Sequence, residues 1–155
     1  MAQKSTDPEA FWNEREQRFE GKVVYRTFAK YLGNSNTRLY DLPGLLYHIN
    51  EKLIFEDFEK ENWLSKLVQR DSDYEKTEFH LQLPQIEKIQ WIARSSAMDI
   101  IDGKKDGREE PPVSKIKKFL AGSVIQVLLK SGKSIFFEIL GEKEFAGHFQ
   151  DKLVS

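Results

Sequence analysis

The tripeptide Gly132-Lys133-Ser134 matches the end of a phosphate-binding loop. Such a loop needs a further glycine five positions before the glycine of the tripeptide, because its backbone amides must wrap around a phosphate. Val127 occupies that position, inside a run of residues typical of a strand. The tripeptide therefore indicates a hairpin turn and not a nucleotide site.

The run DIIDGKKDGREE, residues 99–110, combines acids and glycines as calcium-binding loops do. In such loops the oxygen ligands fall at alternate positions before a glycine. Asp99, Asp102 and Asp106 do not have this spacing. We therefore expect no calcium site.

The three histidines, His48, His80 and His148, are widely separated in the sequence. Glu78 and His80 are two residues apart, which would place them on one face of a strand. Scattered histidines of this kind are more often surface residues than metal ligands. We expect no metal site, but a buried polar cleft that joins His48, His80 and Glu78 would indicate an enzyme.

No arrangement of a catalytic nucleophile is recognisable. The chain has no cysteine, and it lacks the Gly-x-Ser-x-Gly turn of serine hydrolases. Carboxylates crowd residues 56–61, but catalysis would require their pKa values to be separated by burial, and an acidic run is usually solvated. We therefore expect no catalytic residue and no cofactor, and a small hydrolase is the least favoured function.

The composition indicates the class of protein and the compartment in which it works. The 155 residues include 24 Lys and Arg against 25 Asp and Glu, so no global field attracts nucleic acid, which we do not expect as a partner. No apolar run has the length of a signal peptide or a membrane span. The absence of cysteine fits a reducing compartment. We expect a cytoplasmic protein, with peripheral membrane attachment as the alternative.

A helix is expected at the start of the chain. Asp7 followed by Pro8 is a typical helix start, and Phe11, Trp12 and Phe19 then recur at helical spacing up to Gly21. We predict an amphipathic helix over residues 8–20, within an N-terminal unit of residues 1–21. Its apolar side would pack on the rest of the chain; the alternative is a partner's groove.

The rest of the chain, residues 22–155, has mainly the patterns of strands. Apolar residues alternate with polar ones, and clusters of turn residues separate the runs. Asn50 stands where a hairpin turn needs a positive φ. Strands are expected at 23–32, 45–49, 53–55, 77–83, 86–94 and on both sides of the turn at 131–133. With Phe145, Phe149 and Leu153 spaced at four residues, a closing helix is expected over 142–153.

Two segments interrupt this pattern. Residues 59–76 fit a short helix or an ordered insertion followed by a polar loop. Residues 99–112 hold two glycines, two prolines and eight charged residues, which is the composition of a mobile loop. Residues 113–122 are compatible with a short helix or an irregular segment.

Three segments together resemble the pleckstrin-homology superfold, and its GRAM-like members most closely: GLLYHINEKLIFEDF, FHLQLPQIEKIQWI and VIQVLLKSGKSIFFEI with the Phe145 helix after it. They occur in the order of the family's strands and cover residues 23–153. The resemblance implies a mainly β (α+β) fold, a seven-stranded antiparallel half-open barrel made of two orthogonal sheets and capped by the C-terminal helix. The N-terminal helix is extra, and loops near 59–76 and 95–112 are inserted.

The resemblance also implies a candidate ligand site. In lipid-binding members, Lys and Arg on the first two strands bind phosphoinositide headgroups through several charge-assisted hydrogen bonds. The matching region of this chain offers Lys22, Arg26, Lys30 and Arg38. The family's basic pattern is incomplete, because Tyr40 stands where a second base would follow Arg38. Convergence of these cations on one pocket would favour an anionic lipid; dispersal would favour a scaffold.

We therefore expect a non-catalytic binding or scaffold module that acts through a protein partner, with phosphoinositide binding at a membrane as the alternative. The superfold is often used for protein binding, although fold resemblance is an associational argument for function. Trp63 and Leu64, beside the acidic run, are a candidate interaction patch, although packing of Trp63 in the core is favoured.

Overall fold

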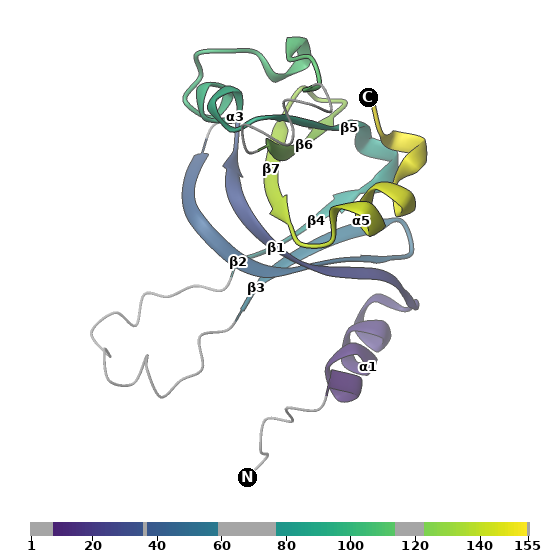
Figure 1. The fold of residues 1–155 in the computed structure, drawn as a ribbon. Helices are drawn as coiled ribbons and strands as arrows, with labels where there is room; N and C mark the ends of the chain where they lie inside the picture. Colours follow the sequence, from purple (N-terminus) through teal and green to yellow (C-terminus); the bar gives the residue numbers. More distant parts are fainter. Residues whose placement is uncertain (1–7, 36, 59–76, 114–122, 155) are drawn as a thin grey trace, which may run out of the picture.

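The described part of the chain folds as a mainly β structure with three α-helices (Figure 1). This computed structural model describes residues 8–35, 37–58, 77–113 and 123–154, and the backbone alone for residues 37–40. The predicted segment 59–76, with Trp63 and Leu64, lies outside the described residues, as do 114–122. No helix among the described residues has the length and hydrophobicity to cross a membrane.

Seven antiparallel strands form one sheet in the order β4-β3-β2-β1-β7-β6-β5. Their bounds are β1 Val23–Asn34, β2 Thr37–Ile49, β3 Lys52–Asp57, β4 Glu78–Gln82, β5 Ile86–Ala93, β6 Ser123–Leu129 and β7 Ser134–Ile139. The prediction of mainly antiparallel β structure is confirmed. The resemblance implied two orthogonal sheets, whereas these strands form one continuous sheet, because the long β1 pairs with β2 on one side and with β7 on the other.

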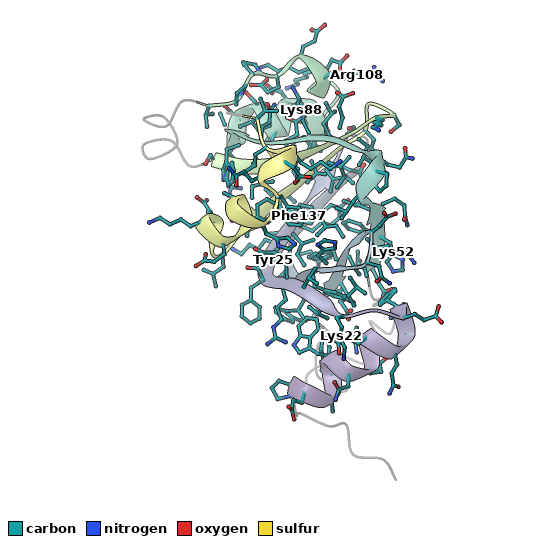
Figure 2. The ribbon with its side chains drawn as sticks, turned by 90° about the vertical axis from the view of Figure 1, so that its right-hand side faces the viewer. Lys22, Tyr25, Lys52, Lys88, Arg108 and Phe137 are labelled. Carbon is teal, nitrogen blue, oxygen red and sulfur yellow. The ribbon has the colours of Figure 1, made fainter. Side chains whose placement is uncertain are left out.

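The sheet curves around one apolar core (Figure 1). Alternate residues of every strand contribute side chains to this core, and this alternation is the reason that the strands could be predicted from the sequence. Phe137 points into this core in Figure 2. The buried cluster consists of Ala29, Tyr31, Leu46, Leu53, Phe55, Leu81, Ile86, Ile89, Trp91, Ile125, Val127, Ile135, Phe137, Ile139, Phe145 and Phe149.

Helix α5, Glu142–His148, covers the opening of the curved sheet (Figure 1). It is shorter than the predicted 142–153, because the chain continues as a 3-10 turn over Gln150–Lys152. Phe145 and Phe149 are buried as expected, and Leu153 is partly buried against the same core. Leu153 also forms a parallel bridge with Ile89 on the outer edge of β5.

Helix α1, Pro8–Phe19, lies on the outer side of β2 and β3 (Figure 1), as the packing interpretation required. Asn50 in the β2–β3 turn has the expected positive φ of 54°. Its side-chain amide donates to the carbonyl of Phe19 at 2.9 Å and so closes the helix C-terminus. A Cβ at Gly21 would lie 2.3 Å from the Asn50 side chain, so a larger residue here would displace the amide that donates to Phe19.

The segment after β5 corrects the sequence analysis. Residues 94–101, expected to open an inserted loop, form helix α3, Arg94–Ile101. Ile100 and Ile101 pack with Ile92 and Phe136 in a second buried cluster on the outer face of β5 to β7. The segment 99–112, expected to be a mobile loop, therefore begins inside a helix and is packed on the sheet through Ile100 and Ile101.

The remainder of this segment is fixed by buried polar side chains. Gln90 and Gln126 are neighbours on β5 and β6 and join through a hydrogen bond of 2.8 Å. Their side chains also donate to the backbone carbonyls of Glu110 and Gly107. Because buried amide groups need partners, these bonds fix the chain around the 3-10 turn Gly107–Glu109 on the sheet.

Candidate functional site

Three of the four predicted cations lie on β1 or directly before it and do not converge on a pocket. Lys22, Arg26 and Lys30 are exposed and four residues apart in sequence. Four residues of strand span about 13 Å, so the three charges are spread along β1. For Arg38 the structure gives only the backbone, which pairs with Gly33.

Two of these cations already have neighbours. The Nζ of Lys22, whose side chain is 85% exposed, is 3.6 Å from a carboxylate oxygen of Glu16 at the α1 end of the molecule (Figure 2). The Arg26 guanidinium lies 4.9 Å from the centre of the Trp12 ring, a cation–π distance. Both residues therefore join β1 to α1 and do not form a phosphate pocket.

Apolar side chains stand between the cations on the same face. Val24 is 57% exposed and Phe28 is 55% exposed, whereas Tyr25, Ala29 and Tyr31 point into the core. Leu140, just after β7, is 68% exposed, and its amide donates to the Phe28 carbonyl at 3.1 Å.

The Phe58 ring lies 5.8 Å from that of Phe28. We call Val24, Arg26, Phe28, Lys30, Phe58 and Leu140 together the β1 outer surface. The apolar members were not identified from the sequence. The sequence contained the information, because Val24 and Phe28 stand at even-numbered positions, as Arg26 and Lys30 do.

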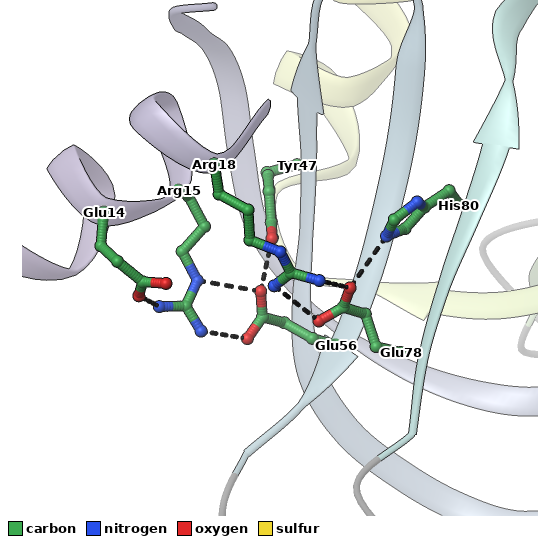
Figure 3. A network of polar contacts seen from close by, with 7 residues as sticks. All are labelled: Glu14, Arg15, Arg18, Tyr47, Glu56, Glu78 and His80. Atoms are coloured by element: carbon green, nitrogen blue, oxygen red, sulfur yellow. Dashed lines mark hydrogen bonds and ion pairs between the residues drawn. The ribbon is translucent and has the colours of Figure 1, made fainter. Parts of the chain in front are cut away.

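A buried polar network attaches α1 to the sheet (Figure 3). The Arg15 guanidinium donates from Nε to Glu56 at 3.1 Å and from its terminal nitrogen at 2.6 Å. The Tyr47 hydroxyl donates to the same carboxylate. Arg15 and Glu56 are 8% and 1% exposed, so two opposite charges are satisfied in the interior.

The network perturbs the ionisation of its members. Burial raises the pKa of Tyr47, and the Glu56 carboxylate raises it further. Burial acts to lower the pKa of Arg15, but the hydrogen bond and charge of Glu56 outweigh it and raise that pKa. Tyr47 is therefore held as a neutral donor and Arg15 as a cation, which is a structural and not an acid–base arrangement.

A second ion pair lies beside it. Arg18 forms two bonds with Glu78, one of them 3.1 Å, and His80 contacts the same carboxylate at 2.8 Å (Figure 3). Burial acts to raise the pKa of Glu78, but Arg18 and His80 lower it overall. The Phe19 ring packs edge-on against His80.

The other two histidines, His48 and His148, form a pair on the other face of the sheet. His48 Nδ1 is 2.8 Å from His148 Nε2, and His48 Nε2 is 2.5 Å from the Asn50 carbonyl. Because a carbonyl only accepts, His48 donates from Nε2, and in the neutral pair His148 donates to His48. Tyr25 stacks on His148, and burial and His48 lower the pKa of His148.

The cleft that would have indicated an enzyme is not formed. His80 and Glu78 face α1, whereas His48 faces α5 and Phe149 on the opposite side of the sheet. Among the described residues no three His, Asp or Glu side chains gather as a metal site would require. These side chains support the packing of α1 and α5.

Comparison with known proteins gives no functional assignment. The chain matches no protein-family model, no curated protein and no solved structure.

Proposed function

We propose that this chain is a non-catalytic binding module that acts through a protein partner. The supporting observation is the β1 outer surface, where Val24, Phe28 and Leu140 are each more than half exposed. Large apolar side chains gathered on the surface of a well-formed domain are typical of protein contacts. The polar clusters at α1 and α5, by contrast, have satisfied structural roles.

We also propose that the fold is of the pleckstrin-homology type. The strand order, in which β1 lies between β2 and β7, agrees with a sheet rolled into a half-open barrel. Helix α5 closes the opening with Phe145 and Phe149. In that interpretation α1 is an addition to the fold, and α3 belongs to the insertion after β5.

The rival function is binding of phosphoinositide headgroups. A multiply charged ring needs several cations around one pocket, whereas Lys22, Arg26 and Lys30 are dispersed along the outer face of β1. We therefore rank this function below protein binding.

The deciding experiment compares the two functions directly. The chain is mixed with vesicles with and without phosphatidylinositol bisphosphate at low and physiological salt, and in parallel is crosslinked in native extract and its partners identified. We expect a reproducible protein crosslink and no headgroup-dependent pelleting. Pelleting that needs the phosphoinositide and is lost in a Lys30→Ala/Arg38→Ala double variant would overturn the proposal.

A further inference from the structure

The β1 outer surface combines apolar and basic side chains. Arg26, Phe28 and Lys30 project from the same face of β1 at intervals of about 7 Å, and Val24 is exposed at the β-bulge just before them. Leu140 lies directly beside Phe28, because their backbones are joined by a hydrogen bond. Of the five large apolar side chains left exposed among the described residues, only Val154 lies elsewhere.

The two cations of this surface are available for an incoming carboxylate. In the described part of the chain, neither Arg26 nor Lys30 takes part in an ion pair. Glu138 is the cross-strand neighbour of Lys30, but it pairs with Arg94 instead. The Trp12 ring beside Arg26 limits the conformations of the guanidinium. Less side-chain entropy is therefore lost when Arg26 binds.

We propose that the β1 outer surface binds an acidic segment of a partner protein that also carries large apolar side chains. This inference rests on the proposed protein-binding function and specifies its site and the chemistry of the partner. Apolar side chains of the segment pack against Phe28, Phe58 and Leu140. Its Asp or Glu side chains pair with Arg26 and Lys30, where complementary charge sets orientation and partner choice.

Charge around the surface favours a protein segment over a bilayer. Glu138 lies next to Lys30 on β7, and Glu16 lies next to Lys22. A continuous anionic membrane would meet these carboxylates together with the cations. A peptide can place its acids at Arg26 and Lys30 alone and avoid the others. Membrane binding is therefore not proposed, and it is one of the results by which the experiment can overturn the proposal.

The test uses a phage-displayed library of random linear peptides, selected on the full chain. We expect the selected peptides to be enriched in both acidic and large apolar residues. Their binding should weaken at least about tenfold in Phe28→Asp and in Lys30→Glu, a loss typical of a central contact. Lys133→Glu, at the exposed β6–β7 turn, is the matched charge control and should bind as wild type does.

A charge-reversed peptide separates a lost contact from a lost fold. If one acid of a selected peptide contacts Lys30, replacing it with lysine should weaken binding to wild type and restore binding to Lys30→Glu. Thermal unfolding of the Phe28 and Lys30 variants should match wild type, since both side chains are exposed.

Five outcomes would overturn the inference. Selected peptides without acidic enrichment, or peptides that bind Phe28→Asp as tightly as wild type, would show that the chain binds protein elsewhere and leave the proposed function intact. Retention on phosphatidylserine vesicles that needs Phe28 and Lys30, with no peptide bound, would refute both proposals. A dimer in solution that Phe28→Asp dissociates would assign the surface to a second copy of the chain. Failure to select any peptide would also count against it.

Discussion

The Arg15 guanidinium of α1 and the Glu56 carboxylate of β3 face each other in the interior, 41 residues apart in sequence and joined by two hydrogen bonds. Tyr47 on β2 supplies a third donor to this carboxylate. The ion pair therefore fixes the position of a helix that the resemblance to the pleckstrin-homology superfold does not include. Removing Arg15 would take the guanidinium and its two hydrogen bonds away from a carboxylate that is 1% exposed.

We expect Arg15→Met to lower the free energy of unfolding by about 3 kcal/mol, because the Glu56 charge then loses its partner in a buried site. The measurement is urea denaturation followed by circular dichroism, with hydrogen exchange of α1 amides as a local readout. The double variant Arg15→Met/Glu56→Leu should recover part of the loss, because no buried charge remains. Equal stability of wild type and Arg15→Met would contradict the buried ion pair.

Acid should weaken the Arg18–Glu78 contact. The pKa of Glu78 lies below its ordinary value of 4.5, since Arg18 and His80 outweigh the effect of burial. A carboxyl with a depressed folded-state pKa contributes stability that is complete above its unfolded value and is lost as pH falls through the folded value. Because Arg18 is 43% exposed, we expect a contribution below about 1 kcal/mol.

The check is the difference in unfolding free energy between wild type and Glu78→Gln across the acid range. This difference should be constant above pH 4.5 and should shrink below it. A difference that grows on acidification would show that the carboxylate is not stabilised in the folded state.

The His48–His148 pair should make the packing of α5 sensitive to pH. Burial and the charge of His48 lower the pKa of His148 from its ordinary 6.5, against a smaller opposing effect of Asp151. The folded state then binds fewer protons than the unfolded state near that pH. Stability from this site is therefore complete above 6.5 and falls as pH drops below 6.5, until His148 is protonated in both states.

The expected result is a smaller unfolding free energy at about pH 5.5 than at about pH 7.5, with a weaker pH dependence in His148→Gln, which lacks the titrating ring. An NMR titration of the His148 ring should give a midpoint below 6.5. A midpoint above that value would mean that the imidazolium is favoured in the fold. His148→Gln retains a side chain able to hydrogen-bond His48, so loss of that hydrogen bond is controlled.

The sequence predicted the parts of this fold that depend on local pattern. Alternation revealed the strands, and Asn50 marked the β2–β3 turn because few other residues accept a positive φ. The β6–β7 hairpin followed from two β-rich runs around Gly132, whose φ is 96°. These signals are contained within a few residues, so no tertiary information was needed.

Features that depend on how distant segments pack together could not be predicted from local patterns. Helix α3 was hidden because Asp99 and Asp102 give its end the composition of a loop, although Ile100 and Ile101 carried the signal of a buried face. The pairing of Arg15 with Glu56 requires knowledge of which strand α1 covers. Alternation along β1 places its cations on one face of the strand. Their separation along the strand is too large for them to line a single pocket.

The close contact between Gly107 and the sheet gives a last prediction, which tests steric packing and not backbone strain. A Cβ at Gly107 would lie 2.2 Å from Ser134 Oγ and 2.8 Å from Gln126 Nε2, both in buried side chains. Gln126 also donates to the Gly107 carbonyl and to Ser134, so a displaced Gln126 would lose satisfied hydrogen bonds. We expect Gly107→Ala to destabilise the fold by about 1–3 kcal/mol.

Gly147→Ala is the matched control, because no atom lies within 4 Å of its added Cβ. Within helix α5, alanine should be neutral or stabilising by up to about 1 kcal/mol. Thermal unfolding of both variants tests this contrast. If neither Gly107→Ala nor Gly147→Ala changed the stability, the segment around Gly107 would be able to move away from β6 and β7 with no loss of free energy. The buried Gln90–Gln126 pair would then not be what holds this segment on the sheet.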